Sequence, residues 1–145
     1  MAALLRACFH WLSDREGFDA RQRAFLTGER SSEQTIREEA RTRPHWVARR
    51  DGAIAGFVTV DGHQIARLYV HPQFHRQGIG KALFAAAEAM IRQAGFAEVT
   101  VGALVDSAVA FYQSMGMTIT GSEIYEPDIF LGRRVTLLSK RLTVG

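Results

Sequence analysis

The sequence predicts a single mixed α/β domain built around one sheet, and three observations support this fold class. Residues 46–70 contain three strand-like apolar runs separated by two Asp-Gly pairs, which are typical of tight hairpin turns. Residues 78–94 have the 3.6-residue apolar period of an amphipathic helix. Three further strand-like segments and one more helix follow later in the chain. At 145 residues the chain has the length of one domain that can bury a proper core.

Three helices are expected before the first strand. Residues 3–12 have a helical apolar period and no small-residue cleavage site, so an amphipathic helix is favoured over a signal peptide. A short second helix is expected around Ala20–Leu26. Ser32 can cap a third helix, which should end before Pro44 because the residue before a proline disfavours the helical conformation. The apolar face of the first helix consists of Leu4, Leu5, Cys8, Phe9 and Leu12.

The segment 46–70 is predicted to form an antiparallel three-stranded meander. A type I′ turn needs positive φ at both central residues, and Asp-Gly meets this need. The strands are expected at Trp46–Arg50, Ala53–Val60 and Gln64–Val70, with turns at Asp51-Gly52 and Asp61-Gly62.

The second half of the chain alternates between helix and strand. The helix over residues 78–94 has Gly95 as a natural terminator, since glycine readily adopts the left-handed conformation that ends helices. Next come a strand at Glu98–Ala103, a helix from Asp106 or Ser107 through Met115, and strands at Met117–Thr120 and Arg134–Leu142.

The composition excludes some functions and selects none. The formal charge is +3, and no basic block interleaved with aromatic residues indicates a nucleic-acid surface. No stretch approaches the ~20 apolar residues of a membrane span. Cys8 is the one cysteine, so an internal disulfide is impossible; we expect a buried core thiol and a cytoplasmic protein. The histidines match no metal-binding spacing, so no metal is expected.

The segment His71–Lys81 is the strongest candidate for a binding site. A strand ends there, a proline follows, and Gly78-Ile79-Gly80 opens a helix. The first turn of a helix has N–H groups without partners and a partial positive charge, and glycines let a phosphate approach them. Arg76 and Lys81 add positive charge, so a diphosphate is the expected ligand.

This motif alone is weak evidence, because a Gly-x-Gly at a helix start often serves only close backbone packing. Two common nucleotide sites do not match. The chain lacks the G-x-G-x-x-G fingerprint with its acidic partner, which disfavours a Rossmann site, and it lacks the G-x-x-x-x-G-K-[ST] of a P-loop.

The chain resembles the GNAT superfamily of N-acetyltransferases. The family signature Gln/Arg-x-x-Gly-x-Gly/Ala falls on His75-Arg76-Gln77-Gly78-Ile79-Gly80. The preceding Leu68-Tyr69-Val70-His71-Pro72 is similar to the strand that enters this turn, and Ala108–Met117 is similar to the family's A-x-x-x-Y-x-x-x-G-F. The resemblance covers roughly residues 46–120, and three matches in the right order are far more specific than one.

The resemblance implies a GNAT-like fold with a central, mostly antiparallel sheet flanked by helices, and acetyl-CoA as the co-substrate. In this family one strand separates from its neighbour, and acyl-CoA lies in the gap. By that resemblance the Leu68 and Val70 main chains bind the thioester carbonyl and the pantetheine arm, while Arg76 to Lys81 hold the pyrophosphate. The implied cofactor-binding residues are Leu68, Tyr69, Val70, His75, Arg76, Gln77, Gly78, Ile79, Gly80, Lys81 and Phe111.

Three features depart from the family pattern. His75 stands where Gln or Arg is usual, and Met117 replaces a phenylalanine. The family's first strand is not evident before the N-terminal helices, so either it is absent or the helix at 3–12 is wrong.

Tyr112 matches the family tyrosine that protonates the leaving CoA thiolate after direct attack by the amine. A phenol of pKa ~10 beside a thiol of pKa ~8.5 makes this transfer plausible. The alternative is ordinary helix packing of Tyr112 and Phe111. Because the attack is direct, Cys8 is not expected to act as a nucleophile.

The general base is left open. Some family members carry Glu on the strand before the turn, where this chain has Gln64, which cannot take a proton. The candidates are His63, Glu123, Glu126 and Asp128, and each is also compatible with a plain surface position.

The acceptor is expected to be a small-molecule amine or a peptide N-terminus. Glu126 and Asp128 would suit a cationic acceptor, and Trp46, Phe57 and Tyr125 could form an apolar wall. The alternative function is a non-catalytic acyl-CoA-binding or regulatory module on the same fold. A homodimer is possible through the terminal segment Arg134–Leu142.

Overall fold

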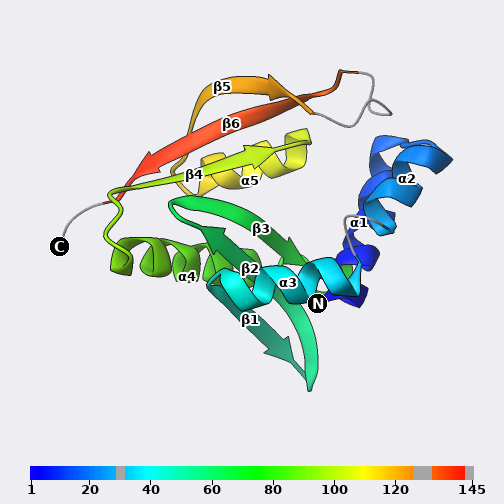
Figure 1. The fold of residues 1–145 in the computed structure, drawn as a ribbon. Coiled ribbons are helices and arrows are strands. Elements are labelled where there is room, and N and C mark those ends of the chain that lie inside the picture. Colours follow the sequence, from blue (N-terminus) through cyan, green and yellow to red (C-terminus); the bar gives the residue numbers. More distant parts are fainter. Residues whose placement is uncertain (29–31, 126–131, 143–145) are drawn as a thin grey trace.

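A computed structural model of the chain describes residues 1–28, 32–125 and 132–142. Within them six strands form one sheet in the order β1-β2-β3-β4-β6-β5 (Figure 1). Every neighbouring pair is antiparallel except β3 and β4, which are parallel. The predicted mixed α/β class with a mostly antiparallel sheet is confirmed. The strands are β1 (His45–Arg50), β2 (Ala53–Asp61), β3 (Gln64–Val70), β4 (Glu98–Ala103), β5 (Thr118–Ile124) and β6 (Arg134–Arg141).

Helices cover both faces of the sheet. One core cluster joins side chains of α1, α2 and α3 to Phe57 and Tyr69. The other joins α4 and α5 to the opposite face, where Leu83, Phe84 and Ile91 are buried. In the part of the chain that the structure describes, no helix is long and apolar enough to cross a bilayer. The helices are α1 (Ala2–Glu16), α2 (Ala20–Thr27), α3 (Glu33–Thr42), α4 (Ile79–Gln93) and α5 (Asp106–Ser114).

The N-terminal helices follow local sequence signals. The expected helix over residues 3–12 is present but runs four residues further, to Glu16, because the chain first adopts the left-handed conformation at Gly17 (φ 69°). The Ser32 side chain accepts a hydrogen bond from the Thr35 N–H, so its predicted capping role is confirmed. Residues 2–16 form a helix rather than a strand, so the helical interpretation of this segment is correct.

The two predicted hairpin turns differ from each other. Asp51 (φ 51°) and Gly52 (φ 77°) both have positive φ, as a type I′ turn requires. In the second turn β2 continues to Asp61, so the central residues are Gly62 and His63. Of these only Gly62 has positive φ, which fits a type II′ turn and corrects the predicted type I′ turn.

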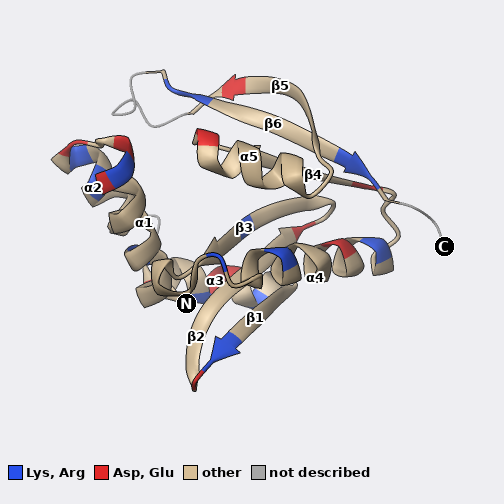
Figure 2. Ribbon diagram, turned by 180° about the vertical axis from the view of Figure 1, so that it is seen from behind, with Lys and Arg blue, Asp and Glu red and all other residues tan. Residues whose placement is uncertain are grey.

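The last two strands also differ from the prediction. β5 is longer than expected, reaches Ile124 and lies at the edge of the sheet with every residue exposed. β6 lies between β4 and β5, so Arg134–Leu142 is not an exposed tail that could pair with a second copy. Figure 2 shows basic and acidic positions together on α4, so this helix does not have a surface of one charge.

Candidate active site

β3 and β4 separate from each other, and this separation creates the site. Between the described residues of β3 and β4, Gln64 and Thr100 form the one register pair. Beside it the Thr100 N–H donates to the His63 carbonyl at 3.0 Å. From that end the two strands diverge (Figure 1). A cleft of about 900 Å³ lies between them, within the range of small-molecule sites.

A bulge in β3 lies where the pairing stops. Thr59 faces Arg67 and Val60 faces Ile65, so Ala66 is the extra residue on β3. Bulges bend a strand and often end its pairing beside active sites. The separation of β3 from β4 therefore starts at a defined feature of the backbone.

The main chain of Leu68 and Val70 faces the cleft. The His71 N–H donates to the Ala55 carbonyl of β2 at 2.7 Å, and polar groups of alternate strand residues point in opposite directions. Leu68 and Val70 therefore turn their N–H and C=O groups away from β2, toward the side where β4 has diverged. Main-chain donors and acceptors without a ladder partner are what an extended, amide-containing ligand needs.

The turn after β3 has the backbone geometry of an anion-binding loop. Arg76 (φ 64°) and Gly78 (φ 78°) are left-handed, and Gln77 between them is not. Such alternation turns successive N–H groups toward one point, and Gly78 is also the N-cap of α4. A Cβ at Gly78 would meet no atom within 4 Å, so this glycine faces open space.

Gly80 has a packing role. A Cβ there would lie 3.1 Å from a carbon of the Phe111 ring, so the glycine lets α4 approach α5 closely. The two glycines of the motif therefore differ: Gly78 supplies a backbone conformation, and Gly80 supplies space for Phe111.

The cleft collects most of the residues that the sequence singled out. Gln77 is exposed and does not line it. Trp46 is exposed on β1 and Phe57 is fully buried elsewhere, so neither forms the expected acceptor wall, whereas Tyr125 does line the cleft. The predicted residues around the cleft are Leu68, Tyr69, Val70, His75, Arg76, Gly78, Ile79, Gly80, Lys81, Phe111 and Tyr112.

His75 replaces the usual Gln or Arg and makes a contact within the protein. Its Nε2 lies 3.0 Å from the Val70 carbonyl oxygen, which can only accept, so Nε2 carries a proton. Its ring also meets Trp11 edge to face, with centroids 4.8 Å apart. The Cys8 Sγ donates to the same carbonyl at 3.2 Å. Both lone pairs of the Val70 carbonyl are thus engaged, which leaves Leu68 with the freer main-chain groups.

Tyr112 is buried on α5 and lines the cleft. Burial raises the pKa of its phenol well above the ordinary value, and the Tyr69 phenol adds a smaller upward effect. Tyr112 therefore stays neutral, and transferring its proton to a thiolate is less favourable than the ordinary phenol pKa suggested. It remains suited to donate a hydrogen bond to a developing negative charge.

Cys8 is a buried, free thiol, as predicted. Burial raises its pKa from 9.0 to about 12, so very little of the reactive thiolate exists near neutrality. Because the folded-state pKa is the higher one, this group stabilises the fold below pH 9, and its contribution is lost as the pH rises toward about 12.

We therefore predict that Cys8→Ala preserves the function of the cleft. The acetyl transfer that the sequence resemblance implies, measured as release of free CoA thiol, should stay within about threefold of wild type, because the thiol takes no covalent part. Native Cys8 should also resist iodoacetamide at pH 8. Trapping of an acetyl group on Cys8, or a large loss of turnover in the variant, would contradict this prediction.

The expected general bases do not gather in the described part of the cleft. His63 is exposed and lies against Phe96 rather than the cleft, with ring centroids 5.6 Å apart. Glu123 is exposed on β5 and does not line the cleft, while Glu126 and Asp128 lie outside the described residues. No carboxylate of the described residues lines the cleft. Nor do those residues include a cluster that could hold a metal ion.

One wall of the cleft comes from α1, which the sequence interpretation did not include. Trp11, Leu12 and Arg15 line it together with Cys8. They follow Cys8 at three-, four- and seven-residue spacings. A predicted helix that continued as far as Gly17 would therefore have placed all of them on one face. Arg133 connects the end of α1 to the segment after β4. Its Nη2 donates to Glu16 at 2.9 Å, and its Nε donates to the Leu104 carbonyl at 3.2 Å.

Comparison with known proteins identifies the family. The model of the acetyltransferase (GNAT) domain matches residues 14–131. The chain belongs to the GNAT family. The resemblance seen in the sequence and the prediction of an acetyltransferase domain are thereby confirmed.

Individual GNAT relatives agree with this assignment. Human N-acetyltransferase 8 is 35% identical over 92 residues, which are 55% of this chain and 40% of that protein, so the chain spans less than half of that relative. A GCN5-related N-acetyltransferase from Rhodopseudomonas palustris has a TM-score of 0.85 at 23% identity, covering 97% of this chain and 87% of its own. PaiA N-acetyltransferase from Thermoplasma acidophilum, solved with coenzyme A, has a TM-score of 0.71 at 19% identity, covering 97% and 89%. The two structures show that the GNAT fold is shared.

Proposed function

We propose that this GNAT protein transfers an acetyl group from acetyl-CoA to a primary amine by direct attack in a ternary complex. The observation that supports this most strongly is the cleft between β3 and β4, with the Leu68 and Val70 main chains facing it. The left-handed turn at Arg76 and Gly78 follows directly, at the start of α4. An extended amide chain that ends in a diphosphate, as in CoA, fits this order of groups.

In the proposed reaction the protein supplies binding and electrostatic stabilisation. The Leu68 N–H would donate to the thioester oxygen, which gains negative charge when the amine attacks. A C–N bond forms, the C–S bond breaks, and the neutral Tyr112 phenol donates to the departing sulfur. The proton lost by the amine passes to water or to a base, and no carboxylate of the described residues lines the cleft. A pantetheine amide that binds the Val70 carbonyl would displace the Cys8 thiol, the weaker donor there.

The proposed acceptor is a small-molecule amine or a peptide N-terminus. The charged residues that line the described cleft are all basic, and those with exposed side chains are Arg15, Arg76 and Lys81. They suit the phosphates of CoA and offer no counter-charge to a polycationic amine. A cationic acceptor therefore depends on Glu126 and Asp128.

Two measurements test the proposal. Acetyl-CoA at 100 times its dissociation constant should stabilise the protein by about 2.7 kcal/mol, which raises the melting temperature by several degrees. Release of free thiol should then follow addition of amines from a panel of amino acids, monoamines, polyamines and peptides. Stabilisation without thiol release would indicate a non-catalytic acyl-CoA-binding module. Absence of stabilisation would contradict CoA binding altogether.

A further inference from the structure

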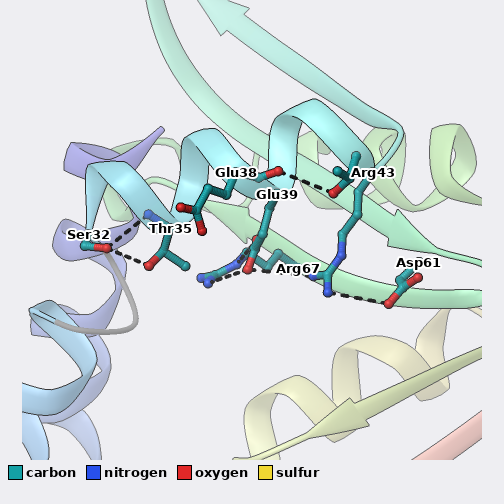
Figure 3. Close-up of polar contacts among 8 residues, drawn as sticks. Ser32, Thr35, Glu38, Glu39, Arg43, Asp61 and Arg67 are labelled. Carbon is teal, nitrogen blue, oxygen red and sulfur yellow. Dashed lines mark hydrogen bonds and ion pairs between the residues drawn. The ribbon is translucent and has the colours of Figure 1, made fainter.

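Arg67 of β3 is a buried cation bound to α3 (Figure 3). Its Nε donates to Glu39 Oε2 at 2.7 Å, and its Nη2 donates to Glu39 Oε1 at 3.1 Å. Arg43 extends this contact, because its Nη1 lies 3.7 Å from Glu39 Oε1 and its Nη2 lies 3.5 Å from Asp61 Oδ2. Asp61 ends β2, so these four charges connect α3 to the hairpin of β2 and β3.

This ion pair is poorly explained by stability. Arg67 is 2% exposed, and its Nη1 is a buried nitrogen without a hydrogen-bond partner among the described residues. The Thr59 Oγ1, directly across the strand pair, is in the same situation. Replacing a buried ion pair by apolar residues is often neutral or stabilising, so an apolar pair could join helix and sheet at least as well. A costly arrangement of this kind points to a functional constraint.

The position of Arg67 supplies such a constraint. It comes directly after the bulged Ala66, at the point where β3 leaves β4. It comes directly before Leu68, whose main chain faces the cleft. A bidentate contact on the α3 side fixes the rotation of the strand at residue 67, and the direction of the Leu68 N–H follows from that rotation.

We propose that Glu39 and Arg67 are positioning residues, which hold the bulged segment of β3 so that the Leu68 N–H points at the reacting carbonyl. Neither side chain reacts itself. This role rests on the proposed function, and it predicts a loss in the rate of transfer that exceeds any loss of binding. An oxyanion donor contributes through the transition state, so misalignment lowers kcat more than it changes KM.

Glu39→Gln tests the role, with Glu88→Gln as a matched control. Glu39 and Glu88 side chains are 17% and 18% exposed, and Glu88 pairs with Lys140 Nζ at 3.1 Å on the opposite face, away from the cleft. Both variants should lose similar thermal stability. E39Q should lower kcat about tenfold, with KM for the amine unchanged, whereas E88Q should stay within about twofold of wild type.

A double variant separates positioning from stability. In R67M/E39L the buried charges are replaced by apolar side chains of similar length, so the protein should fold with a melting temperature near that of wild type. Its kcat should still be about tenfold low, because methionine cannot make the bidentate contact. Full recovery of kcat in this variant would overturn the proposal. The double variant also carries the test if E39Q does not fold.

The outcomes distinguish this role from the function on which it rests. Wild-type protein that transfers no acetyl group would remove both. Wild-type transfer with equal kcat in E39Q and E88Q would remove the positioning role and leave the proposed function intact.

Discussion

Replacing Tyr112 with phenylalanine is expected to lower kcat about 100-fold and leave the affinity for CoA within about twofold, as for a residue that acts only in the transition state. The ring contacts of Tyr112 with Phe84 and Phe111 are 6.3 Å and 5.2 Å between centroids, and phenylalanine preserves both. The fold should therefore survive, and the effect should come from the lost hydroxyl group at the sulfur.

Steady-state release of free thiol gives kcat, and a thermal melt with CoA reports binding. Tyr69→Phe is the informative comparison, because Tyr69 is the second phenol whose charge acts on Tyr112. Its loss should lower kcat less than tenfold. A strong effect of Tyr69→Phe with none of Tyr112→Phe would transfer the proposed role to Tyr69.

The pH profile adds an independent check on Tyr112. Burial raises the pKa of this phenol well above its ordinary value, so the protonated form that donates to sulfur persists to high pH. Titration of Tyr112 should therefore not lower wild-type kcat between pH 8 and pH 10. Any fall in kcat over this range should also be present in Tyr112→Phe. A fall in wild-type kcat that is absent from Tyr112→Phe would mean that Tyr112 is more exposed to solvent in the working enzyme than in this structure.

The turn proposed to bind the diphosphate was predictable because its determinants are local. A strand end, a proline and Gly-x-Gly lie within eleven residues, and each has a direct effect on the backbone. The left-handed conformation of Arg76 carries no such signal, because arginine seldom adopts it. The motif therefore located the site, but its full geometry depends on the folded chain.

Features that depend on distant segments were not predictable. The wall formed by Trp11 and Arg15 requires α1 to pack beside a turn sixty residues away. The contact between Glu39 and Arg67 joins residues 28 apart in the sequence. In the sheet β6 lies between β4 and β5, although β5 comes before it in the sequence. Apolar alternation does not encode this order of the strands. Only tertiary packing decides these points.

The proposed charged contacts with the diphosphate give the second large effect. Arg76→Gly combined with Lys81→Ala is expected to weaken CoA binding about 100-fold, since each charged contact to phosphate contributes about tenfold. Substituting Gly78 instead would combine loss of the site with strain, because its φ is 78°. Glycine at position 76, where φ is 64°, relieves strain of about 1 kcal/mol and offsets its own entropic cost, so the fold should be retained.

Isothermal titration with CoA measures the loss, and Arg50→Ala provides the control for removing a positive charge far from the cleft. Arg50 ends β1 and does not line the cleft, so its variant should bind CoA within about twofold of wild type at 0.15 M salt. The strongest support would be a double variant that melts within about 3 °C of wild type and yet binds CoA weakly. Unchanged affinity in that folded variant would show that the main-chain donors of the turn suffice without charge, or that the diphosphate lies elsewhere. Dephospho-CoA and CoA should lose affinity equally, because the missing charges act on the diphosphate rather than on the 3′-phosphate.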